Sequence, residues 1–139
     1  MSCAEMEMRE SAGGADATGS GTASAGSTFS GFPASNAFDN NAASLWSGSG
    51  DATDSAWLAY DFGSGVTKDI VQISFTARND IDYTQSPTAG WIESSTDAIN
   101  WLPRWTFLGL SWSQGSTNVF TDPGYTPPST GRRRQIVNC

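Results

Sequence analysis

The sequence predicts an all-β domain, a single jelly-roll sandwich of about eight short strands over residues 1–139. Short runs of alternating apolar and polar residues recur at roughly even spacing, separated by Gly, Pro, Asp and Ser, which is typical of sandwiches and jelly rolls. No stretch of a dozen residues has the ~3.6-residue apolar stripe of a helix. Only 15% of the residues are charged, and the abundance of Gly, Ser, Thr and Asn suits strands and turns.

The expected strands follow this alternation along the chain. In the first of them, Ala4, Met6 and Met8 share one face and acidic or basic residues occupy the other, which indicates a half-buried strand. Residues 79–90 are expected to form a polar loop. The expected strands cover residues 4–9, a stretch within 21–33 that ends in a protruding loop, then 58–62, 71–75, 91–95, 104–110, 116–121 and 132–138.

Aromatic side chains are expected to supply much of the core volume, because each of them buries a large apolar area. The chain has six Trp, three Tyr and seven Phe. The aromatic residues assigned to the core are Phe38, Trp46, Trp57, Phe62, Phe75 and Trp101.

Charge and residue content exclude several classes of function. The net charge of −7 argues against nucleic acid and against an anionic membrane surface, since both attract cationic proteins. The chain has no His, and its two cysteines, Cys3 and Cys139, stand far apart in the sequence, so neither a Ser–His nor a Cys–His nucleophile is available. The acidic pair Asp80 and Asp82 fits a solvated loop better than a glycosidase site. We therefore expect a binding protein and no enzyme.

The first residues of the chain are acidic, whereas a signal peptide begins with basic residues and an apolar run. No apolar run approaches the ~18 residues of a membrane span. The expectation is a protein without signal peptide or membrane insertion, which reaches an extracellular place through lysis or through assembly into a particle.

The most informative stretch is ASNAFDNNAASLWS, residues 34–47. It resembles the signature of the coagulation-factor type C or discoidin family and of family 32 carbohydrate-binding modules, in which an Ala-Phe-Asp-Gly-Asn turn precedes Thr-x-Trp. The set of matches is most similar to versions carried by tailed bacteriophages, and it implies a galactose-binding-like jelly roll. The further matches are CAEMEMRESAGG at 3–14, WLAYDFGSG at 57–65, ISFTARND at 73–80 and SSTDAINW at 94–101, where Ala98 stands in place of the usual Gly.

One departure from the family concerns the order of the strands. The strand that resembles Ala-Glu-Ile-Glu comes last in most members, whereas here it comes first, and RRRQIVNC at the end resembles the strand that normally precedes it. The sequence thus resembles a circular permutation, which requires neighbouring termini. Only in that case is a disulfide between Cys3 and Cys139 plausible, and two free thiols remain the alternative.

The resemblance also implies a structural calcium ion in the turn of residues 36–44. Calcium takes six to eight oxygen ligands. An alternative is an Asx-type turn in which Asp39 only accepts hydrogen bonds from backbone amides. The implied ligands are the carbonyls of Asn36 and Asn41, the carboxylate of Asp39, the hydroxyl and carbonyl of Ser44, the carbonyl of Ala4 and the carboxylate of Glu5.

A second candidate site would bind a surface glycan. Sugar sites combine an aromatic platform with a few hydrogen-bonding side chains, and several loop residues offer both kinds of group. Trp91 joins them because it points outward if Ile92 points inward. The family's sugar sites frequently use His, which this chain lacks, so protein contact is kept as an alternative. The candidate ligand-binding residues are Phe32, Arg78, Asn79, Asp80, Tyr83, Trp91 and Trp112.

These observations lead to two hypotheses of function. The first is a non-catalytic carbohydrate-binding-like module of a phage particle, present in many copies, that adheres to host surface glycans. The second is a structural or decoration protein of the virion, which uses the same fold to contact other virion proteins. Fold alone does not decide between them.

Overall fold

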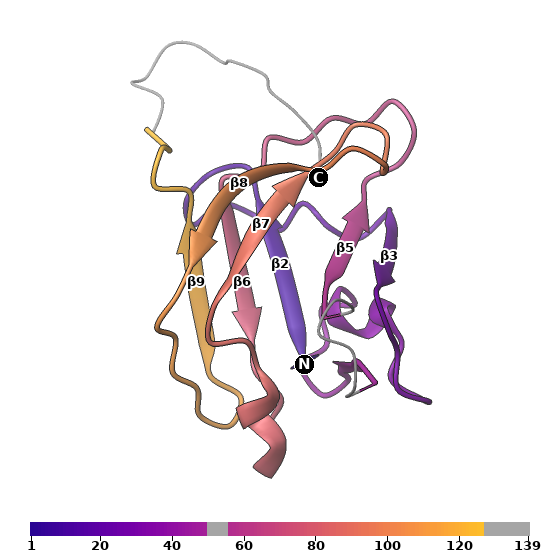
Figure 1. Ribbon diagram of the computed structural model, residues 1–139, viewed down its shortest axis with the longest axis vertical. Helices are drawn as coiled ribbons and strands as arrows, with labels where there is room; N and C mark the ends of the chain where they lie inside the picture. The colour runs from indigo at the N-terminus through magenta and orange to yellow at the C-terminus, as the bar shows by residue number, and fades with distance from the viewer. Residues whose placement is uncertain (50–55, 127–139) are drawn as a thin grey trace.

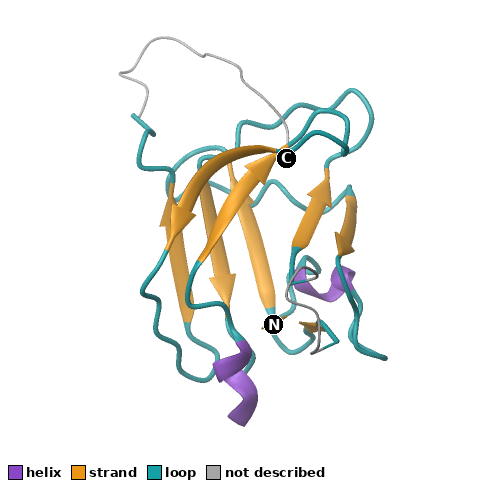
Figure 2. Ribbon diagram, in the orientation of Figure 1, coloured by secondary structure: helices purple, strands orange, loops and turns teal. Residues whose placement is uncertain are grey.

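The structure, a computed structural model, describes residues 1–49 and 56–126, which form strands, turns and two short 3-10 helices without any α-helix (Figure 2). This confirms the predicted all-β fold. The elements are β1 (Ser2–Cys3), β2 (Glu5–Arg9), β3 (Thr22–Ala25), η1 (Ala34–Ala37), β4 (Trp46–Ser47), β5 (Leu58–Asp61), β6 (Gln72–Thr76), η2 (Ile81–Gln85), β7 (Gly90–Ser94), β8 (Leu102–Phe107) and β9 (Thr117–Thr121).

The strands form one three-stranded sheet and three antiparallel pairs. The sheet has the order β2-β6-β9, and the pairs are β1–β4, β3–β5 and β7–β8. The β7–β8 pair crosses in front of β6 and β9 in Figure 1, and Phe107 of β8 stacks on Phe120 of β9 with ring centroids 4.8 Å apart. The two layers therefore pack face to face, as in a sandwich.

Seven of the eight expected strands correspond to β2, β3, β5, β6, β7, β8 and β9. The expected strand at 132–138 lies outside the described residues, as do the three arginines at 132–134 and Cys139. Strand β8 begins two residues before its expected start at 104. The two-residue strands β1 and β4 and the helices η1 and η2 were not expected, because elements this short carry too few residues to show a period.

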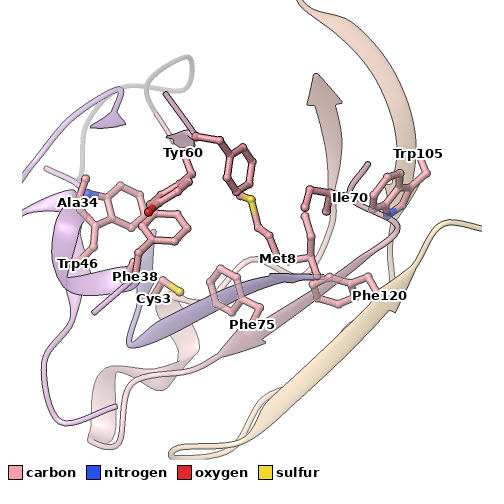
Figure 3. Packing of buried hydrophobic residues seen from close by; sticks show 13 residues of the cluster. Cys3, Met8, Ala34, Phe38, Trp46, Tyr60, Ile70, Phe75, Trp105 and Phe120 are labelled. Carbon is pink, nitrogen blue, oxygen red and sulfur yellow. The ribbon is translucent and has the colours of Figure 1, made fainter. Parts of the chain in front are cut away.

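The core lies between the three-stranded sheet and the facing strands. Figure 3 shows Met8 of β2 at its centre, with Trp46, Phe38 and Tyr60 on one side and Trp105 with Phe120 on the other. The alternation of β2 explains this position, because it turns Met8 inward while Glu7 and Arg9 stay partly exposed. The core assignments that the structure confirms are Phe38, Trp46, Phe62 and Phe75.

The assignment of Trp57 and Trp101 to the core was wrong. Trp57 is 46% exposed and Trp101 is 39% exposed. Trp57 precedes β5, in which Tyr60 points inward, so the period of two turns Trp57 outward. Trp101 would share the inward face of Trp105 in a regular strand, but the register of β8 shifts between the two residues and reverses the alternation.

The turn between β7 and β8 contains Ala98, which stands where the family usually has Gly. Ala98 has a φ of 57°, a left-handed conformation that glycine adopts more readily than other residues. The Asp97 carboxylate accepts hydrogen bonds from the backbone N–H groups of Asn100, at 2.7 Å, and Ile99, at 2.9 Å. The bonds from Asn100, the largest influence, hold the pKa of Asp97 below its usual value. These bonds hold the turn closed around the unfavourable φ of Ala98.

Tyr60 ties the chain before β3 to β5. Its hydroxyl oxygen accepts hydrogen bonds from the backbone N–H groups of Gly19 and Gly21, both at 2.7 Å. Gly21 is needed for this approach, because a Cβ there would lie 2.0 Å from the carbonyl oxygen of Asp61. The chain before β3 therefore lies against β5 with no room for a side chain.

Tyr60→Phe is expected to lower the free energy of unfolding by roughly 1–3 kcal/mol, because two backbone N–H groups lose their acceptor. Urea denaturation followed by tryptophan fluorescence measures the change. Tyr83→Phe is the control, since the Tyr83 hydroxyl has no hydrogen bond to the described residues and should leave stability within about 0.5 kcal/mol. Equal effects of the two substitutions would contradict the assigned role of the Tyr60 hydroxyl.

Candidate functional site

The turn of residues 38–45 connects η1 to β4. The Asp39 carboxylate accepts one hydrogen bond from the backbone N–H of Asn41, at 3.0 Å, and another from the hydroxyl of Ser44, at 2.7 Å. Asn40, between them in sequence, has a φ of 57°, which Asn tolerates better than most residues. The Asn36 side chain donates to the carbonyl of Leu45 at 3.1 Å and closes the base of the turn.

Glu5 brings β2 to the same turn. One oxygen of its carboxylate accepts from the backbone N–H of Asn41 at 2.8 Å, and the residue is only 7% exposed. Burial raises the pKa of Glu5 to about 7, although hydrogen bonds from Asn41 and Met6 oppose the rise, and the nearby charge of Asp39 adds to it. No salt bridge among the described residues compensates the Glu5 charge.

The structure thus brings together four of the six residues implied as calcium ligands: Glu5, Asp39, Asn41 and Ser44. The Ser44 hydroxyl lies 2.7 Å from a carboxylate oxygen of Asp39 and 2.8 Å from the carbonyl oxygen of Asn41. Three oxygens at such separations can share one calcium ion, whose ligands lie at about 2.3–2.6 Å. Within residues 1–49 and 56–126, no group of three or more His, Cys, Asp or Glu residues could by itself hold a metal ion, so a calcium ion here would depend on carbonyl and hydroxyl oxygens as well.

The hydrogen bonds of Asp39 are equally compatible with an Asx-type turn, because the calcium site and the Asx-type turn both require its carboxylate at this position. The burial of Glu5 is the observation that the Asx-type turn does not explain. Ala4, the remaining implied ligand beside Asn36, is buried and donates its backbone N–H to the carbonyl of Thr76 at 2.9 Å.

A pocket of about 440 Å³ lies beside this turn. Its volume falls within the usual range of roughly 300–1,000 Å³ for small-molecule sites. Ala4 stands just before β2 and Arg78 shortly after β6, and because these strands are antiparallel neighbours both residues meet at one end of the sheet. The pocket is lined by Ala4, Ala42, Ala43, Leu45, Arg78, Asn79 and Asp80.

The polar side of the pocket is held rigidly. Arg78 donates from Nε and Nη2 to the two carboxylate oxygens of Asp80, both at 2.6 Å, and its Nη2 lies 3.6 Å from the carboxylate of Asp82. Its side chain is only 13% exposed. The hydrogen bonds from Arg78 keep the pKa of Asp80 below its usual value, so Asp80 is ionised at neutral pH.

Asn79 is positioned by the loop that precedes β9. The backbone N–H of Gly115 donates to the carbonyl of Arg78 at 3.1 Å, and a Cβ on Gly115 would lie 3.3 Å from the Asn79 side-chain oxygen. Three of the seven candidate ligand-binding residues, Arg78, Asn79 and Asp80, therefore gather around one pocket. Tyr83 lies close by in sequence on η2, and its backbone N–H donates to the carbonyl of Asp80 at 3.2 Å.

Neither Tyr83 nor the three other candidate aromatics line this pocket. Trp112 packs against the core, with its ring centroid 5.3 Å from that of Phe75, and its indole N–H donates to the carbonyl of Pro87 at 2.9 Å. Phe32 is partly buried and stacks on Phe29. Trp91 is 68% exposed on the outer face of β7 because Ile92 packs inward, as its alternation predicted.

Sequence reasoning missed the apolar lining of the pocket, which Ala42, Ala43 and Leu45 provide. These residues belong to the same motif as Asp39, but small apolar side chains carry no chemical signal of their own. Phe29, exposed beside Phe32, was missed as well. The spacing of the two phenylalanines, three residues apart in a Ser- and Gly-rich loop, could have drawn attention to the pair.

No helix formed by the described residues is long and apolar enough to cross a membrane.

Comparison with known families matches residues 18–121 to the F5/8 type C domain. The match runs from the loop before β3 to the last residue of β9 and leaves out β1 and β2. No curated protein and no solved structure matches the chain. The match covers most of the sequence, and the β-sandwich architecture agrees with it. The chain belongs to the F5/8 type C, or discoidin, family, whose members are generally non-catalytic modules that bind carbohydrates or other ligands.

Proposed function

We propose that this domain holds a surface glycan in the pocket between the 38–45 turn and residues 78–80, and that many copies of it attach a phage particle to its host. The observation that carries the proposal is the composition of the pocket. Arg78, Asn79 and Asp80 supply polar groups on one side, and small apolar side chains supply the other. A sugar ring has the same division between hydroxyls and apolar C–H groups.

The rigidity of the polar side supports this proposal. Arg78 and Asp80 fix each other through two parallel hydrogen bonds, so a ligand would not have to order them, and this lowers the entropic cost of binding. A single small pocket binds weakly, and display of many copies on a virion would convert weak contacts into firm attachment.

Asn79→Ala is expected to reduce glycan binding at least about tenfold, since the loss of one well-placed hydrogen-bonding group costs roughly 1.4 kcal/mol or more. The measurement is a glycan array probed with multivalently presented protein, followed by titration of the hits. The melting temperature should stay within a degree or two, because Asn79 is exposed.

Trp91→Ala is the matched control and should leave glycan binding unchanged, because Trp91 lies away from the pocket lining. If Trp91→Ala, and not Asn79→Ala, impaired the activity of the protein, a second candidate function would be favoured, contact with other virion proteins. The exposed apolar residues in and around the β7–β8 hairpin, Trp91, Ile99, Leu102 and Leu108, support that candidate. In that case Trp91→Ala would abolish a virion contact, detected as loss of co-sedimentation with the particle, while the arrays show no hits.

We also propose that the turn holds a structural calcium ion. Glu5 and Asp39 would supply carboxylate oxygens, and Asn41 and Ser44 would add a carbonyl and a hydroxyl. The buried, uncompensated carboxylate of Glu5 beside a second carboxylate supports the proposal, because a divalent cation would offset the cost of placing both charges there. The ion would fasten β2 to the turn and thereby fix the wall of the pocket.

Calcium at saturating concentration is expected to raise the melting temperature by several degrees, because a ligand at about 100 times its Kd stabilises the native state by about 2.7 kcal/mol. Chelator should reverse the effect, and magnesium should not replace calcium, because it demands a smaller octahedral site. Asp39→Ala should abolish the response and Glu5→Gln should weaken it. Identical melting curves with calcium and with chelator would leave the Asx-type turn as the correct description.

A further inference from the structure

We propose that the pocket selects neutral sugars and rejects acidic ones, because the edge of Arg78 that would bind a ligand carboxylate is already occupied by Asp80. This inference rests on the proposed glycan-binding function and names the class of ligand.

The geometry of Arg78 carries the first step. Arginine recognises a carboxylate through two parallel N–H···O bonds from one edge of its guanidinium group. The edge formed by Nε and Nη2 makes this pair of bonds with the two oxygens of Asp80, both at 2.6 Å. An acidic sugar could use the edge only by displacing a carboxylate of the protein that is already in place.

The local charge carries the second step. Two carboxylates, Asp80 and Asp82, lie within 3.6 Å of the single guanidinium group of Arg78. The turn on the other side of the pocket adds Asp39. An anionic ligand would therefore approach an excess of negative charge, and like charges across a binding interface oppose association. Even with a calcium ion in the turn, Asp80 and Asp82 would still outnumber Arg78.

The other cations of the described chain are engaged elsewhere. All four Lys and Arg residues within residues 1–49 and 56–126 take part in salt bridges: Arg9 with Glu7, Lys68 with Glu10, Arg78 with Asp80 and Asp82, and Arg104 with Asp69. No described Lys or Arg side chain is thus left to draw an acidic group into the pocket.

The groups that remain available match hydroxyls. Arg78 keeps the N–H donors of Nη1, and the Asn79 amide offers both a donor and an acceptor. Asp80 accepts three hydrogen bonds, from Nε and Nη2 of Arg78 and from the backbone of Asp82, so one of its roughly four acceptor positions is free. A sugar hydroxyl donates and accepts at once, whereas an ionised carboxylate only accepts.

The test uses matched pairs of neutral and acidic sugars on a glycan array, galactose with galacturonic acid and glucose with glucuronic acid. The full chain, presented multivalently, should bind at least one neutral member with at least a tenfold preference over its acidic partner. That binding should change less than twofold when NaCl rises from about 0.05 to 0.5 M, since screening weakens only charge-dependent contacts.

Asp80→Ala should free the Arg78 edge and raise binding of the uronic acids at least tenfold, in a salt-sensitive manner. Asp61→Ala, which removes an exposed carboxylate on β5, is the matched control and should leave both preferences unchanged. Asp80→Asn, which removes the charge and keeps the shape, replaces Asp80→Ala if circular dichroism shows the latter to be unfolded.

The outcomes separate this inference from the function on which it rests. Preference of the wild-type chain for acidic sugars would overturn the inference and leave glycan binding standing. Neutral binding by the wild type with no gain of acidic binding in either Asp80 variant would also overturn it, because Asp80 would then not be what blocks Arg78. Absence of binding to every sugar, neutral or acidic, would overturn the proposed function itself.

Discussion

Deletion of residues 1–9 is expected to unfold the domain completely. All five residues of β2 pair with β6, from Glu5 opposite Thr76 to Arg9 opposite Gln72. The deletion also removes Met8 and Cys3 from the core, and the loss of a buried Met side chain alone costs about 2–5 kcal/mol. Together with the lost strand pairing, this cost approaches the total free energy of unfolding of a typical domain, roughly 5–15 kcal/mol. Circular dichroism and proton NMR would show the loss of folded structure.

The same deletion tests the permuted strand order that we propose. The family match begins at residue 18, yet β2 pairs with β6 inside the matched region, as expected if this strand has moved from the end of the family's order to the beginning. Residues 1–9 joined after residue 139 through a short Gly/Ser linker should then restore folding. A stable, soluble domain without residues 1–9 would contradict the assigned role of β2. Failure of the relocated strand to restore folding would argue against the permutation.

Trp46→Ala is expected to lower the free energy of unfolding by about 3–5 kcal/mol, the usual cost of removing a large aromatic side chain from a core. Trp46 is fully buried and stands opposite Cys3 in the β1–β4 pair. Its indole N–H donates to the carbonyl of Ser27 at 3.1 Å, so the substitution also removes one of the hydrogen bonds that hold the loop carrying Phe29 and Phe32. Urea denaturation measures the difference.

Trp91→Ala is the matched control for this substitution, because the same side chain is removed from a position that is 68% exposed. Its expected effect on unfolding is within about 0.5 kcal/mol. Similar losses in the free energy of unfolding for the two variants would show that burial of Trp46 stabilises the domain less than its packing indicates.

The fold was predictable where a strand keeps a regular period. Alternation located β2 and β6 closely, because each turns apolar residues at alternate positions to the core. Trp101 was assigned to the core by residue type, and the register shift in β8 that turns it away from the core leaves no mark in the sequence pattern. Trp57 was assigned by residue type, although the alternation of Leu58 and Tyr60 already indicated the opposite face.

The candidate site was predictable only in part, for a similar reason. The family motif located the contact between Glu5 and the turn around Asp39, and the polar residues after β6 marked Arg78 and Asp80. Nothing in the sequence separated a platform tryptophan from a core tryptophan. Trp112 was therefore predicted to bind ligand, as Tyr83 was, although a hydrogen bond to Pro87 and contact with Phe75 hold Trp112 against the core.

The pairing of β2 with β6 also sets an order for folding during synthesis. Strand β2 emerges from the ribosome before its partner residues 72–76, which lie far along the chain. Pairings of this kind form slowly because a long loop must close first. Until then β2 is an unpaired strand, which is prone to associate with other chains. Glu5, Glu7 and Arg9 place charges at alternate positions along it. These charges would keep the unpaired β2 from aggregating before β6 is synthesised.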